Sequence, residues 1–200
     1  MRDGLDMNNL AQRQPRSPGE NMRDPARASG VPLGRRVRLS RALEHAETLF
    51  VSRVAQDGGI DPWRRLTEVR FLHARRRLAR AGRLSSGDSA ALIVALVDVV
   101  MRDQCWLQVE SDRDPVWTGF WLHLARRALP PYRAEPLFLL GWSAWRSGDF
   151  GLARRAVDAA LVEEPGHVAA TMLATLLRTA VDPSALPALS DRPATVGGTG

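Results

Sequence analysis

Hydrophobic residues along this chain recur with the period of α-helices, and no stretch alternates apolar and polar residues over the length of a strand. In the segment 38–56, for example, Leu39, Leu43 and Phe50 lie on one helical stripe. Similar stripes, bounded by Gly, Pro and Asp, predict about eight helices. The pattern therefore predicts an all-α fold. The expected helices span about 38–56, 61–81, 87–100, 102–110, 115–129, 134–146, 150–164 and 167–180.

The two ends of the chain differ in composition from the middle. Residues 1–35 are rich in Asn, Gln, Arg, Pro and Gly and contain few large apolar residues. Such a segment cannot bury enough apolar surface to fold alone, so we predict a disordered, basic N-terminal arm. Residues 182–200 predict a disordered tail. One helical domain, residues 36–181, is expected between them.

The clearest local pattern lies in residues 134–165, where two stripes of small and apolar residues flank a short turn. Gly148 suits a helix end with positive φ, and Asp149 suits the N-cap of the next helix. A third helix, 167–180, is expected to cap the pair. The landmark residues are Leu137, Leu140, Gly141, Ala144, Ala153, Val157, Ala160 and Pro165. Their spacings resemble those of a tetratricopeptide hairpin, which stacks and docks and does no chemistry itself.

The charge of the chain is positive but uneven. All 28 cationic residues are arginine, which suggests a GC-rich genome and makes the basic pI a weak argument for nucleic-acid binding. Residues 1–39 carry eight arginines and four acids, whereas the rest carries 20 arginines and 18 acids. The folded domain is therefore expected to be nearly balanced in charge.

Three features predict a cytoplasmic protein with no membrane association. The N-terminus is polar and lacks the apolar core of a secretory signal. The longest apolar run, residues 90–101, is interrupted by Asp98 and is too short to span a bilayer. A single cysteine, Cys105, excludes an internal disulfide.

A resemblance to a known family rests on three stretches. They are LSSGDSAALIVALVDVVMRD, Trp117, and LFLLGWSAWRSGDFGLARRAVDAALVEEPGHVAATML, with the Arg102-Asp103 pair and the Ala144-Trp145-x-x-Gly148-Asp149 run prominent. Over roughly residues 40–182 the chain resembles an actinobacterial family of uncharacterised proteins, catalogued as domain of unknown function 4192. Longer members have a preceding N-terminal half that residues 1–40 do not show. The resemblance implies a C-terminal helical half, leaves open whether a separate chain supplies the other half, and implies no activity.

The tryptophans give the first candidate site. If the first hairpin helix lines a concave surface, an aromatic face with one arginine is available to a protein segment. The alternative is that Trp142 and Trp145 pack on Trp117 and Trp121 of the preceding helix as an aromatic core. The candidate protein-binding residues are Phe138, Trp142, Trp145 and Arg146.

The second candidate is an arginine-rich helix. Residues 64–83 contain eight arginines and one acid, Glu68. Such density can neutralise phosphates of RNA or DNA, although no helix-turn-helix or zinc-finger pattern accompanies it. The alternative is a solvated or acid-paired face. The candidate nucleic-acid-binding residues are Arg70, Arg75, Arg76, Arg77 and Arg80.

The remaining chemistry-bearing residues indicate no catalytic, cofactor or metal site. The four histidines and Cys105 show no metal-ligand spacing, and no phosphate loop follows a strand. Arg102 and Asp103 are adjacent on a helix and are expected to have different partners. We therefore expect a non-enzymatic interaction or scaffold module with an unidentified protein partner. The alternative is a nucleic-acid-associated accessory protein; the sequence does not indicate an oligomeric state.

Overall fold

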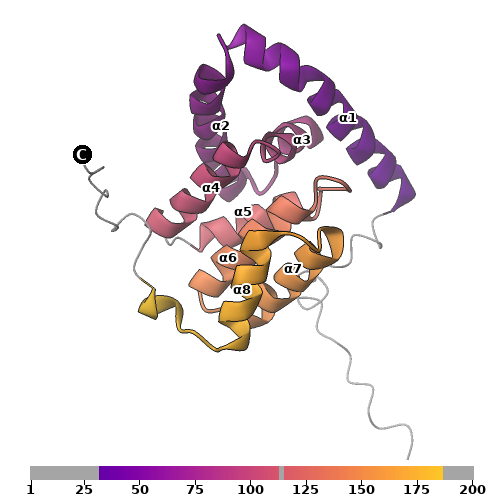
Figure 1. Cartoon of the computed structure of the whole chain (residues 1–200). Helices are drawn as coiled ribbons and strands as arrows, with labels where there is room; N and C mark the ends of the chain where they lie inside the picture. Colours follow the sequence, from indigo (N-terminus) through magenta and orange to yellow (C-terminus); the bar gives the residue numbers. More distant parts are fainter. Residues whose placement is uncertain (1–31, 113–114, 187–200) are drawn as a thin grey trace, which may run out of the picture.

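The computed structural model describes residues 32–112 and 115–186, and every regular element in these ranges is helical. Figure 1 shows α1 and α2 above a group formed by the later helices. The predicted all-α fold with eight α-helices is confirmed for the described residues. The elements are α1 (Leu33–Gln56), α2 (Ile60–Ala81), α3 (Ser86–Ala95), α4 (Val99–Asp112), α5 (Val116–Ala125), α6 (Ala134–Arg146), α7 (Phe150–Glu163), α8 (Val168–Arg178) and the 3-10 helix η2 (Pro183–Ala185).

Most of the predicted arm (1–35) and tail (182–200) lies outside the described residues. Residues 33–35 form the first turn of α1. Residues 182–186 lie against α6, where Arg146 donates a hydrogen bond to the carbonyl oxygen of Pro183. The domain predicted for residues 36–181 is therefore extended at both ends. Within the described ranges, none of the helices has the length and apolarity needed to cross a bilayer.

The predicted helix boundary near residue 101 is wrong. The break lies at residues 96–98, between α3 and α4. Asp98 Oδ1 accepts a hydrogen bond from the backbone N–H of Met101 at 2.9 Å, which satisfies a free donor of the first helical turn. Arg64 of α2 also binds Asp98 at 2.7 Å. The acid that interrupts the apolar run therefore starts α4 and ties it to α2.

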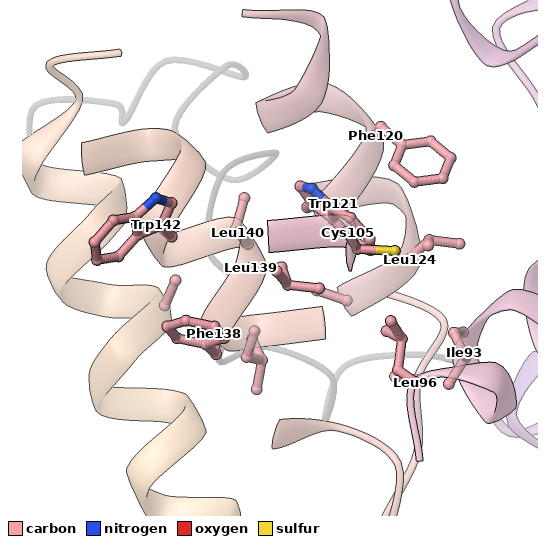
Figure 2. Close-up of a cluster of buried hydrophobic side chains, with 14 of the residues drawn as sticks. Ile93, Leu96, Cys105, Phe120, Trp121, Leu124, Phe138, Leu139, Leu140 and Trp142 are labelled. Atoms are coloured by element: carbon pink, nitrogen blue, oxygen red, sulfur yellow. The ribbon is translucent and has the colours of Figure 1, made fainter. Parts of the chain in front are cut away.

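α6 is the central helix of the domain. Every residue from Pro136 to Trp145 is buried, because α4, α5, α7 and α8 all pack against this helix. A helix that is apolar all round is enclosed by its neighbours, whereas a surface helix has one apolar stripe. In Figure 2, side chains of α6 such as Leu139 and Leu140 lie within the buried cluster.

α6 and α7 form a helical hairpin whose local features match the sequence pattern. Gly148 has a φ of 80°, and Asp149 Oδ1 accepts a hydrogen bond from the N–H of Leu152 at 3.0 Å. The two helices meet at Gly141, where an added Cβ would lie 2.9 Å from Val157 Cγ2. α8 packs against both helices. The small residue is thus required by the close approach of α7.

Candidate functional site

The structure buries the four residues predicted to face a protein partner. Phe138 and Trp145 are 0% exposed, Trp142 is 4% exposed, and the side chain of Arg146 is 3% exposed. Trp106 of α4 lies edge-on to Phe138 and Trp142, with ring centroids 5.1 and 4.9 Å apart. The burial favours the core interpretation of Trp142 and Trp145, since no peptide reaches them in this conformation.

The core has different partners from those expected. Trp117 and Trp121 of α5 stack on each other at 6.0 Å, and Trp121 lies 5.9 Å from the ring of Phe71. These rings form a second aromatic cluster, whereas Trp142 contacts α4. Figure 2 shows Trp121 and Trp142 apart from each other, on different helices.

Arg146 has a structural role. Its Nη2 lies 3.0 Å from Glu110 Oε2, and both side chains are at most 3% exposed. The other carboxylate oxygen of Glu110 accepts a hydrogen bond from Trp142 Nε1. The charge of Arg146 is therefore used inside the domain, where it joins α4 to α6.

The structure divides the five candidate nucleic-acid-binding arginines of α2 into two groups. Arg76 and Arg80 are exposed and form no ion pair within the described residues. The other three bind groups of the domain itself, two of them a carboxylate and one an aromatic ring. These contacts are Arg70–Asp57 at 3.3 Å, Arg77–Asp88 at 3.1 Å, and Arg75 above the Trp117 ring at 4.6 Å.

Arg102 and Asp103 bind each other, so the prediction of different partners is wrong. Arg102 Nη2 lies 2.8 Å from Asp103 Oδ1, because the long guanidinium side chain folds back to its neighbour. Its Nη1 also lies 3.4 Å from Oε1 of Glu135 in the first turn of α6. This pair therefore marks a charged junction between α4 and α6.

Glu135, Glu164 and His167 meet at that junction. His167 is the N-cap of α8, and its Nδ1 accepts a hydrogen bond from the N–H of Ala170 at 3.1 Å. The ring proton of the neutral imidazole must then be on Nε2, which donates to Glu135 Oε2 at 3.2 Å. One oxygen of Glu164 lies within 4.8 Å of the other two polar atoms. Two carboxylates thus lie close together, with one neutral imidazole beside them.

The three side chains are spaced closely enough to hold a metal ion, but the hydrogen bonds of His167 leave its ring without a free lone pair for one. A neutral imidazole has a single free lone pair. That lone pair is on Nδ1, which accepts the Ala170 N–H, so Nε2 cannot coordinate a cation unless α8 loses its cap. Coordination of a metal ion by His167 Nε2 would therefore cost α8 its N-terminal cap.

Two neighbouring cavities meet at Glu135 and Glu164, and together we call them the acidic cleft. One has a volume of about 510 Å³ and the other about 420 Å³. Four carboxylates and one guanidinium line them. Phe50, Leu96 and Val97 supply apolar walls in the larger cavity, as do Val168 and Met172 in the smaller. The charged lining residues are Glu47, Arg102, Asp103, Glu135 and Glu164.

Glu47 is fixed at the rim of the larger cavity by Tyr132. Burial and the hydrogen bond to Glu47 raise the pKa of Tyr132 to about 12, so the hydroxyl stays protonated and donates to the carboxylate. Within the described residues, neither Glu47 nor Glu164 has an ion-pair partner. Two carboxylates of the acidic cleft are therefore available to a cation.

Cys105 and His123 are poorly placed for nucleophilic or acid–base chemistry. Burial and the charge of Glu68 raise the pKa of the Cys105 thiol well above its usual value. Burial and the nearby Arg127 lower the pKa of His123 to about 4. At neutral pH the thiol is protonated and buried, so it is a weak nucleophile.

The residues of the acidic cleft are not recognisable as one site from the sequence. A Glu-x-x-His spacing at residues 164–167 was the available signal, but it lies directly after a predicted helix end. Glu135 is 32 residues away from His167 and Glu47 is further still. Only packing of α1, α6 and α7 brings these side chains to one place.

The comparisons with known proteins give a family and no activity. No curated protein and no solved structure matches the chain. One family matches residues 15–184, a range that contains the acidic cleft and begins within the segment predicted as an arm. Because this match covers most of the sequence, the chain belongs to the family described as Domain of unknown function (DUF4192).

Proposed function

We propose that this domain is a non-catalytic protein-interaction module, located in the cytoplasm, and that the acidic cleft is its binding site. The occupant is a segment of a partner protein that carries one arginine or lysine between apolar side chains. This revises the expected location: the binding residues lie at the α6–α7–α8 junction, and the aromatic face of α6 is core. The tetratricopeptide-like character of the α6–α7 hairpin belongs to the same proposal.

The observation that carries the proposal is the unpaired carboxylate of Glu164. It lies where the two cavities meet, close to Glu135, and has no ion-pair partner within the described residues. Arg102 already lies 3.4 Å from Glu135, and Glu164 adds a second carboxylate beside that pair, so a further cation at Glu164 is favoured. A basic side chain of a partner supplies that cation.

The walls of the cleft indicate what surrounds the basic residue. Val97, Val168 and Met172 are exposed at its edges, and Val168 is 82% exposed. Exposed apolar side chains around a hollow are typical of a binding surface. Apolar neighbours of the arginine or lysine would cover these side chains.

The experiment is selection of a phage-displayed library of random peptides on the wild-type domain, followed by calorimetry with the selected peptides. We expect the selected peptides to share an arginine or lysine with apolar neighbours. The Glu47→Gln/Glu164→Gln variant should bind them at least about tenfold more weakly, the effect of roughly 1.4 kcal/mol. Asp158→Asn, an exposed change on α7 away from the cleft, is the matched control. Selected peptides without a basic residue, or equal affinity for all three proteins, would refute the proposal.

A further inference from the structure

A second hollow, of about 450 Å³, lies between the C-terminal end of α2 and α5. It shares no lining residue with the acidic cleft. Arg126 and Arg127 line it, and no carboxylate of the described residues does. We propose that this hollow holds a phosphate group of a nucleic-acid backbone. The inference goes beyond the proposed interaction function, because it concerns a different surface and an anionic ligand.

Arg127 is the residue that points most clearly to an anion. It is half-buried, and its Nη1 donates a hydrogen bond to the backbone carbonyl oxygen of His123 at 3.2 Å. Burial lowers the pKa of Arg127, and so do the positive charges of Arg35 and Arg126. An arginine remains protonated at neutral pH in spite of this. Arg127 therefore lies at a partly desolvated position near two further positive charges, and a bound anion beside its guanidinium would relieve this strain.

Arg35 adds an independent argument from helix electrostatics. It is exposed in the first turn of α1, a turn that contains no acidic residue. The partial positive charge of a helix N-terminus disfavours a cation there. No ion pair in the described part of the chain compensates Arg35. The positive charge of Arg35 therefore destabilises the first turn of α1, as expected for a residue that is kept for ligand binding.

The surface of α2 indicates a polynucleotide rather than a single phosphate ester. Ala79 and Gly82 line the hollow. The exposed Arg76 and Arg80 lie at the same end of α2, and the exposed Arg83 directly follows its C-cap, without ion pairs in the described residues. At 1.5 Å per residue Arg76 and Arg80 are about 6 Å apart along the helix. A small phosphate ester would bind in the hollow only. The backbone of a polynucleotide carries repeated phosphates, which would also contact these exposed arginines.

The test is fluorescence anisotropy of a labelled single-stranded oligonucleotide titrated with the whole chain at several salt concentrations. We expect binding with a steep salt dependence. Arg127→Gln and Arg35→Gln should each weaken it several-fold and reduce the slope of log K against log salt by about one. Arg155→Gln, which removes an exposed arginine of α7, is the control for net charge and should change affinity less than twofold. Arg35 is exposed and forms no ion pair within the described residues, so Arg35→Gln tests the site even if Arg127→Gln fails to fold.

Three outcomes would overturn the proposal. One is absence of binding at low salt. Another is an equal loss in Arg35→Gln and Arg155→Gln, which would mean that net charge alone attracts the strand. The third comes from competition with inorganic phosphate or a mononucleotide. If either displaces the oligonucleotide at a concentration near the dissociation constant of that small ligand for the domain, the hollow is a site for a small phosphate ester.

Discussion

Gly141 is the position where one methyl group has the largest expected effect on stability. An added Cβ would lie 2.9 Å from Val157 Cγ2 and 3.4 Å from the carbonyl oxygen of Ala153, so α6 and α7 would have to separate. We expect Gly141→Ala to lower the free energy of unfolding by about 1–3 kcal/mol, the usual cost of overpacking. Urea denaturation followed by tryptophan fluorescence measures this change.

Gly119 provides the matched control, since it is also a helical glycine but has no heavy atom within 4 Å of an added Cβ. Gly119→Ala should stabilise the domain by up to about 1 kcal/mol, because alanine favours the helix. Equal effects of the two substitutions would show that helix propensity, and not the approach of α7, determines the requirement at Gly141.

Arg146 shows why single-residue roles were hard to assign from the sequence. Its helical position and aromatic neighbours matched a binding surface, but its partner, Glu110, lies 36 residues earlier and on another helix. A buried pair of charges stabilises a fold only when both partners are present. The sequence contains both residues, but their pairing depends on α4 covering α6, which no local pattern encodes.

At the scale of elements, Asp98 couples three helices and predicts a defined dependence on pH. Burial alone would raise the pKa of Asp98, but hydrogen bonds from Arg64 and from the Met101 N–H lower it below its usual 3.8. The folded state therefore binds this proton less readily than the unfolded state. Its stabilising contribution is complete above the usual aspartate range and is lost as the pH falls through the folded-state value.

Asp98→Asn should therefore lower the urea midpoint at about pH 7, and the difference from wild type should shrink as the pH falls towards about 3. The amide oxygen still accepts the Met101 N–H, so the change isolates the charge. Asp61→Asn removes the exposed carboxylate that also binds Arg64, and it should have little effect. A difference in urea midpoint that stays constant with pH would show that the pKa of Asp98 is not lowered in the folded state.

The helices and several of their ends were the part of the fold that the sequence predicted well. Asp149 accepts a hydrogen bond from the helix that it precedes, and Gly82 ends α2 in the left-handed conformation. These features depend on neighbours within four residues. The neighbours of α6 depend on the whole topology, so the sequence could not show that α4 covers its aromatic face.

At the scale of the whole molecule, two separate surfaces gather side chains of mainly one charge. The acidic cleft joins residues of α1 and α6 with the C-terminal end of α7, and the hollow lined by Arg126 and Arg127, which we call the arginine hollow, joins α2 with α5. Of the second surface, the sequence indicated neither Arg126 nor Arg127. It indicated Arg76 and Arg80, which do not line the hollow, because they lie on one helix. It predicted none of the first, because Glu47, Glu135 and Glu164 come from distant segments.

These two groups of like charge predict how the stability of the domain depends on salt. Glu164 is close to Glu135, and Arg35 acts on Arg127, so each group contains repulsion that salt screens. The screening length falls from roughly 30 Å at 0.01 M to 10 Å at 0.1 M ionic strength. The double variant Glu164→Gln/Arg35→Gln leaves the net charge unchanged and removes part of the repulsion in each group. Its melting temperature should therefore rise less with sodium chloride over this range than that of the wild type.

The matched control for this comparison is Asp158→Asn/Arg155→Gln, which also removes one charge of each sign but lies on α7 outside both groups. Its melting temperature should follow the salt dependence of the wild type, since neither residue belongs to a like-charged group. Differential scanning calorimetry of the three proteins makes the comparison. If the melting temperature of all three proteins depends on salt in the same way, the acidic cleft and the arginine hollow contain no repulsion between like charges. A ligand of opposite charge would then relieve none on binding.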